Sequence, residues 1–105
     1  MITVTFYRSG RLISGFCLKG HSGYAESGFD IVCASVSSAA YMTANTITDI
    51  QQIDADVTAD DGFMQLKLSS KEAEKAQTIL LGFQLHLSAL SEQYKDYITV
   101  KFSEV

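Results

Sequence analysis

A histidine and a cysteine in the first third of the chain have the side chains needed for covalent catalysis. His21 ends an apolar, strand-like segment, and Cys33 follows it after eleven intervening residues. A cysteine attacks carbonyl carbons as its thiolate, and a neighbouring histidine can take the thiol proton and later return it. We therefore predict that His21 and Cys33 form a nucleophile-and-base pair. The competing interpretation is that Cys33 simply packs in an apolar helix.

The position of Cys33 in a helix favours the catalytic interpretation. Asp30 is a suitable N-cap, because an aspartate side chain accepts hydrogen bonds from the free N–H groups of a first helical turn. With Asp30 as N-cap, Cys33 takes the third helical position, near the positive end of the helix dipole, where the thiolate is favoured. Whether Asp30 only caps the helix or also orients His21 stays open. Ser37 lies one turn after Cys33 on the same face, and we interpret it as a supporting hydrogen-bonding residue.

Composition and charge narrow the class of protein. The 105 residues suffice for one small domain, and the net charge of −4 with eight scattered Lys and Arg residues argues against a nucleic-acid partner. The N-terminus has no signal-peptide pattern, and the apolar run at residues 79–83 is too short to span a bilayer. We therefore expect a cytoplasmic protein without membrane contact, whose two cysteines are free thiols. No metal or other cofactor is expected, because the Cys and His residues lack metal-ligand spacing.

The first half of the chain predicts a hairpin followed by a helix. Residues 2–7 and 12–18 alternate apolar and polar side chains around a turn at Gly10, which places Leu12, Ser14, Phe16 and Leu18 on one face. Residues 31–50 change to helical spacing. The expected buried side of this helix consists of Val32, Val36, Ala39, Thr43, Ile47 and Ile50.

The second half predicts another hairpin and helix, followed by a last strand. Residues 55–59 and 63–68 flank Asp60-Asp61-Gly62, a strong hairpin turn signal, and Ser69 with Glu72 predicts a capping box. The helix is expected to reach about residue 91, with a buried side of Ala73, Ala76, Leu80, Phe83, Leu87 and Leu90. Residues 97–102 alternate again. The order ββαββαβ predicts an α+β fold, a two-layer sandwich with two helices on a mainly antiparallel or mixed sheet.

The segment from Gly20-His21 through Asp30-Ile31-Val32-Cys33-Ala34 to Ser37 resembles the signature of the ribosomal-processing cysteine proteases, the Prp (YsxB-like) family. The likeness extends over the whole chain in length and element order. Ser35 departs from the second alanine expected after Cys-Ala, which is a small-for-small change. The resemblance implies that residues 1–105 form one cysteine protease domain. It also implies that His21 and Cys33 are the catalytic dyad, with Asp30 and Ser37 as auxiliary residues.

The resemblance also implies a substrate and a mechanism. Members of the family remove the N-terminal extension of the precursor of large-subunit ribosomal protein 27, cutting a basic peptide after aromatic residues through a thioester, and they form homodimers. Backbone N–H groups at the start of the helix would then be natural oxyanion donors. We predict a substrate loop that orders over the peptide, formed by Gly20, Gly23, Tyr24, Gly28 and Phe29.

Two other functions remain as alternatives on the sequence. A non-enzymatic ribosome-associated or assembly protein would use its surface and not the thiol. A glycine-containing loop that runs into a helix N-terminus could also hold phosphate, although neither a P-loop lysine nor a GxGxxG pattern is present.

Overall fold

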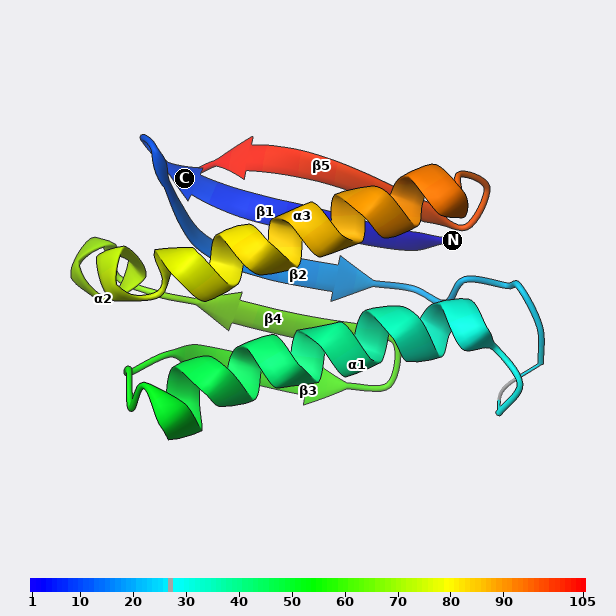
Figure 1. The fold of residues 1–105 in the computed structure, drawn as a ribbon, viewed down its shortest axis with the longest axis horizontal. Helices are drawn as coiled ribbons and strands as arrows, with labels where there is room; N and C mark the ends of the chain where they lie inside the picture. The colour runs from blue at the N-terminus through cyan, green and yellow to red at the C-terminus, as the bar shows by residue number, and fades with distance from the viewer. Residues whose placement is uncertain (27) are drawn as a thin grey trace.

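The protein is a two-layer α+β sandwich with both long helices on one face of a five-stranded sheet (Figure 1). The computed structural model describes residues 1–26 and 28–105; position 27 of the predicted substrate loop lies outside them. The elements are β1 (Ile2–Ser9), β2 (Leu12–Lys19), α1 (Ile31–Asn45), the π-helical turn η1 (Thr46–Ile50), β3 (Asp56–Asp60), β4 (Phe63–Lys67), α2 (Ser70–Lys75), α3 (Gln77–Gln93) and β5 (Ile98–Glu104).

The sheet has the order β3-β4-β2-β1-β5, and all neighbouring strands are antiparallel except β1 and β5. The predicted mixed α+β fold is therefore confirmed. Phe6 and Phe16 of the sheet both meet Phe83 of α3 in edge-on contacts, with ring centroids 5.7 and 4.8 Å apart. These rings mark the centre of the core between the two layers.

A β-bulge in β2 changes which side chains reach the core. Tyr7 pairs with Gly15, whereas Arg8 pairs with Ile13, so β2 carries one extra residue at Ser14. An extra residue reverses the alternation of faces beyond it. The prediction that Leu12 lies on one face with Phe16 and Leu18 is therefore wrong: Ile13 takes that face, is only 2% exposed and lies in the core.

The predicted second helix is two helices, α2 and α3, separated at Ala76. Ser69 caps α2 by accepting a hydrogen bond from the Glu72 N–H, as the capping box predicts. Gln77, the first residue of α3, then bonds the backbone of Ile13 in both directions, with its side-chain amide donating to the carbonyl at 2.8 Å and accepting from the N–H at 3.1 Å. The break in the helix is thus tied to the strand beside the bulge.

The end of the first helix also differs from its prediction. Val32, Val36, Thr43 and Ile47 are buried as expected, and Ala39 packs against the core from a partly exposed position. Ile50, however, is 78% exposed. The π-helical turn η1 advances each residue by a smaller angle than an α-helix does, and it moves Ile50 outward while Ile53 enters the core.

Three segments that are distant in sequence meet at one end of the molecule, on the right of Figure 1: the end of β2, the start of α1 and the β3–β4 turn. Within the residues that the structure describes, no helix has the length and apolar character required to cross a membrane.

Candidate active site

Cys33 lies in the first turn of α1 and is partly buried. Asp30 is the N-cap, and its Oδ1 accepts hydrogen bonds from the N–H groups of Val32 at 3.0 Å and Cys33 at 2.9 Å. The predicted third helical position of Cys33 is therefore confirmed. The Ser22 N–H donates to Cys33 Sγ at 3.2 Å. The sulfur thus lies where the helix dipole and a backbone donor both favour negative charge.

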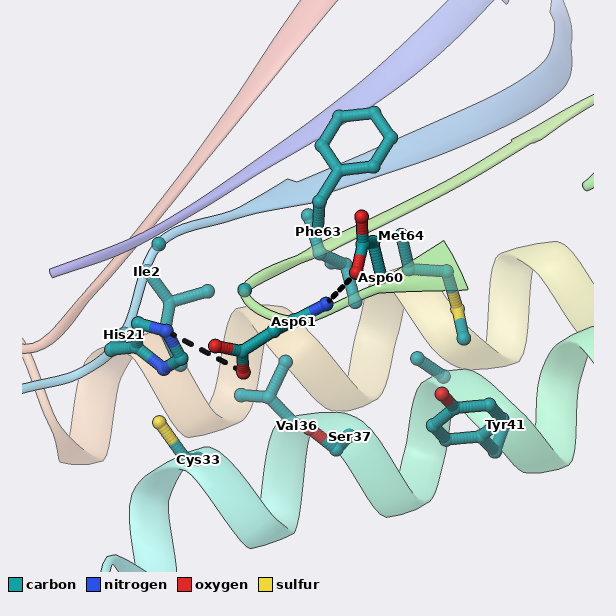
Figure 2. A pocket seen from close by; sticks show the side chains of 14 residues that line it. Ile2, His21, Cys33, Val36, Ser37, Tyr41, Asp60, Asp61, Phe63 and Met64 are labelled. Carbon is teal, nitrogen blue, oxygen red and sulfur yellow. Dashed lines mark hydrogen bonds and ion pairs between the residues drawn. The ribbon is translucent and has the colours of Figure 1, made fainter. Parts of the chain in front are cut away.

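His21 follows β2 and faces Cys33 from the opposite wall of the site (Figure 2). Its side chain is 63% exposed, and its Nε2 lies 3.9 Å from Asp61 Oδ1 on the β3–β4 turn. Two backbone hydrogen bonds hold this segment in place. The Gly20 N–H donates to the Gly62 carbonyl at 2.9 Å, and the Met1 ammonium donates to the His21 carbonyl at 2.6 Å.

Gly62 lies directly against the imidazole ring of His21. Its φ of +67° is a left-handed conformation that suits glycine, and a Cβ at this position would meet His21 Nε2 at 2.8 Å. The turn between β3 and β4 therefore forms one wall of the site, and the absence of a side chain at Gly62 leaves room for the ring.

Asp30 makes its hydrogen bonds with the loop and the first helical turn. Its Oδ2 accepts from the Ser22 hydroxyl, and within the described residues no bond to His21 is found. Burial opposes ionisation of this carboxyl. Hydrogen bonds from Ser22, Cys33 and Ala25 outweigh that effect and lower the pKa of Asp30 to about 2. The geometry thus favours the capping role over direct orientation of His21.

We expect Asp30→Ala to destabilise the protein by about 1 kcal/mol at pH 7, the typical cost of losing an N-cap. Because the folded pKa of Asp30 is lowered to about 2, its charged form contributes stability above the unfolded value of about 3.9. This contribution is lost as pH falls from about 4 to about 2, so the gap between wild type and variant should narrow over that range.

Urea unfolding at pH 7, 4 and 3 measures this gap. Asp96→Ala, which removes an exposed carboxylate from the turn between α3 and β5, is the control for the loss of one acidic side chain. A gap at Asp30 that stays constant down to pH 3 would contradict the role of its charge.

Two hollows of about 460 and 500 Å³ flank the pair, and both are lined by His21, Cys33, Ser37 and Asp61. The first extends toward the apolar side chains of Val36, Phe63 and Met64 (Figure 2). The second extends under the loop before α1. An extended peptide that occupied both hollows would therefore cross Cys33.

The structure brings most of the predicted site residues together. Gly20 lines the first hollow, while Gly23, Gly28 and Asp30 line the second. Tyr24 and Phe29 line neither of them. Tyr24 packs edge-on against Tyr94 and Tyr97, with ring centroids 6.0 and 5.2 Å apart, and Phe29 is 77% exposed. Contact of these two side chains with substrate stays a prediction.

Sequence reasoning missed two residues of the site. Ser22 is 3% exposed and contacts both Asp30 and Cys33, although a serine between a histidine and a glycine resembles an ordinary loop residue. Asp61 reaches His21 from a turn whose sequence indicates only a hairpin. In residues 1–26 and 28–105, no group of three or more His, Cys, Asp or Glu side chains is arranged to hold a metal ion.

A protein family and known proteins with similar sequences share one description. The family model described as Cysteine protease Prp matches residues 1–99. The ribosomal processing cysteine protease Prp of Bacillus subtilis (strain 168) is 29% identical over 107 residues, which cover 95% of this chain and 96% of that protein.

Two crystal structures resemble the fold closely. The essential ribosomal processing protease Prp from S. aureus, in complex with a covalently linked product peptide, has a TM-score of 0.89 and 26% identity over 98% of this chain and all of that one. SMU.848 from Streptococcus mutans has a TM-score of 0.85 and 32% identity over 100% of this chain and 96% of that one. The chain belongs to the Prp family of cysteine proteases.

Proposed function

We propose that residues 1–105 act as one endopeptidase domain in which Cys33 is the nucleophile and His21 is the general acid and base. The observation that carries this proposal is the position of the Cys33 sulfur. It lies at the third position of α1, accepts a hydrogen bond from the Ser22 N–H, and faces His21 between two hollows. Ser37 lines both hollows and is proposed as an auxiliary residue.

The proposed reaction has two steps. The Cys33 thiol gives its proton to His21, and the thiolate attacks the scissile carbonyl carbon. The tetrahedral intermediate then loses the amine, which takes the proton from His21, and a thioester remains on Cys33. In the second step His21 removes a proton from water, and the resulting attack on the thioester releases the new carboxyl end and the thiol. Asp61, 3.9 Å from Nε2, offers a counter-charge whenever the imidazole is protonated.

The proposed substrate is the N-terminal extension of the precursor of large-subunit ribosomal protein 27, cut after aromatic residues in the cytoplasm. Three observations support it. The S. aureus and B. subtilis relatives are ribosomal processing proteases, and the former was solved with a product peptide. Apolar side chains, among them Val36, Phe63 and Met64, line part of the first hollow, which suits aromatic groups, and Asp60 and Asp61 in the same lining suit a basic peptide.

We also propose that the chain forms a homodimer. Its support is the apolar outer side of the helical layer, where Met42, Leu81 and Leu85 are 58, 53 and 74% exposed. A hollow of about 630 Å³ lies between α1 and α3 on this side, lined in part by Met42, Phe83 and Leu90.

The test of the function is cleavage of a synthetic peptide with the N-terminal sequence of the host's own ribosomal protein, with products identified by mass spectrometry. We expect one cut directly after the aromatic residues, and no cut in a control peptide whose aromatic residues are alanine. If the first peptide binds but stays intact, the protein acts on it as a non-enzymatic binding partner.

A further inference from the structure

Three consecutive N–H groups at the start of α1, those of residues 32–34, are already engaged in hydrogen bonds with Asp30. The N–H groups of Val32 and Cys33 donate to Asp30 Oδ1, and the Ala34 N–H donates to the Asp30 carbonyl at 3.1 Å. A donor that is bound to a carboxylate stabilises a second negative charge poorly, because it would have to leave the first. The expectation that these three N–H groups supply the oxyanion donors therefore conflicts with their hydrogen bonds to Asp30.

The Ser22 N–H is a backbone donor that already points at the reacting atom. Its nitrogen lies 3.2 Å from Cys33 Sγ, and it reaches the sulfur from the end of β2 and not from α1. When a thiolate adds to a carbonyl, the new oxyanion is bonded to the carbon that carries the sulfur. The oxyanion therefore develops within hydrogen-bond reach of a donor placed beside that sulfur.

The Ser22 peptide group is held on several sides, so its N–H needs little reorganisation during the reaction. The Ser22 hydroxyl donates to Asp30 Oδ2 and accepts from the Tyr24 N–H at 3.1 Å. Two residues earlier, the Gly20 N–H is fixed to the Gly62 carbonyl. Ser22 itself is 3% exposed, so water competes little for its groups.

We propose that the backbone N–H of Ser22 is an oxyanion donor of this enzyme. In the resting site it donates to the Cys33 sulfur. As the S–C bond forms, the π electrons of the carbonyl move to oxygen, and the N–H transfers its hydrogen bond from sulfur to that oxygen. As the C–N bond breaks, the pair returns to form the thioester carbonyl. The inference rests on the proposed function, because this oxyanion arises only if Cys33 attacks a peptide carbonyl.

Replacement of the His21–Ser22 amide by an ester removes this donor while it keeps every side chain. The positions of the two cysteines make the variant accessible, since a synthetic segment of residues 17–32 can be ligated at Cys17 and Cys33. Loss of one oxyanion donor lowers kcat by about 100-fold or more, and we expect that loss with KM within about threefold of the unmodified synthetic protein. Affinity for a peptide aldehyde, whose adduct with Cys33 carries the same oxygen, should fall in parallel.

The matched control is an ester at Val105, whose N–H donates to the Arg8 carbonyl at 2.9 Å and which lines neither hollow. This variant also loses one backbone hydrogen bond and should keep its kcat. Equal kcat in the Ser22 ester and the unmodified protein would overturn the inference alone, as would an equal loss in both esters. If the unmodified protein cuts no peptide and binds no aldehyde, the proposed function fails and the oxyanion role fails with it.

Discussion

Replacing Cys33 by alanine is expected to lower peptide cleavage by at least about a thousandfold, because the nucleophile of the proposed thioester pathway is removed. The N-cap hydrogen bonds from the main-chain N–H groups of Val32 and residue 33 to Asp30 persist in the variant, which loses only the bond from the Ser22 N–H to the sulfur. Cleavage rates with the peptide in excess, followed by chromatography, measure the effect. The variant should still bind the peptide, because both hollows keep their other lining residues.

The chain contains its own control for this experiment. Cys17 is a second free cysteine, buried in β2 and outside both hollows. Cys17→Ala therefore removes a thiol without touching the site and should leave the rate per folded molecule unchanged. Thermal unfolding checks that both variants are folded. If Cys33→Ala cuts as fast as wild type, Cys33 is a packing residue and the proposed mechanism is wrong.

His21→Ala is expected to reduce kcat by about 10²–10⁴-fold, the usual contribution of a general acid and base. Both steps of the proposed reaction should slow, because the imidazole takes the proton of the thiol in the first step and activates water in the second. Alkylation of Cys33 by iodoacetamide should also slow at neutral pH, since the thiol loses the base that accepts its proton. Because the His21 side chain is 63% exposed, added imidazole should enter the vacated space and restore part of the activity.

His86 supplies the matched control for that variant. It is the other histidine of the chain and lies exposed on α3, on the side of the α1–α3 hollow. His86→Ala should leave both cleavage and the alkylation rate unchanged. An unchanged kcat in His21→Ala, with alkylation also unaffected, would exclude His21 as the base.

The parts of the fold that were predictable depend on residues close together in sequence. The cap at Asp30, the hairpin turn at Gly62 and the capping box at Ser69 each require a side chain or a backbone angle within a few positions. The parts that escaped prediction depend on distant contacts. The break between α2 and α3 coincides with the hydrogen bonds between the Gln77 side chain and the Ile13 backbone, and no local sequence pattern predicts these bonds.

The same distinction applies to the candidate site. Cys33 and His21 could be proposed because their residue types are reactive and their positions at a helix start and a strand end follow from local patterns. The contacts of Ser22 with Cys33 and of Asp61 with His21 form only because β2, α1 and the β3–β4 turn meet in the folded protein. A serine N–H that points at a sulfur, and an aspartate that approaches a ring from another hairpin, have no sequence signal of their own.

The two hairpin turns of the sheet differ in the substitutions that their glycines would tolerate, during evolution or in a mutational scan. Gly10 and Gly62 have nearly the same backbone angle, with φ of +63° and +67°. A Cβ at Gly10 meets no atom within 4 Å, whereas one at Gly62 presses on the His21 ring. Asparagine, which accepts left-handed angles, would therefore pass at position 10 as a neutral change. At position 62 the same substitution would be selected against, because its side chain would displace the imidazole of His21, the proposed base. The backbone angle alone favours glycine no more at position 62 than at position 10.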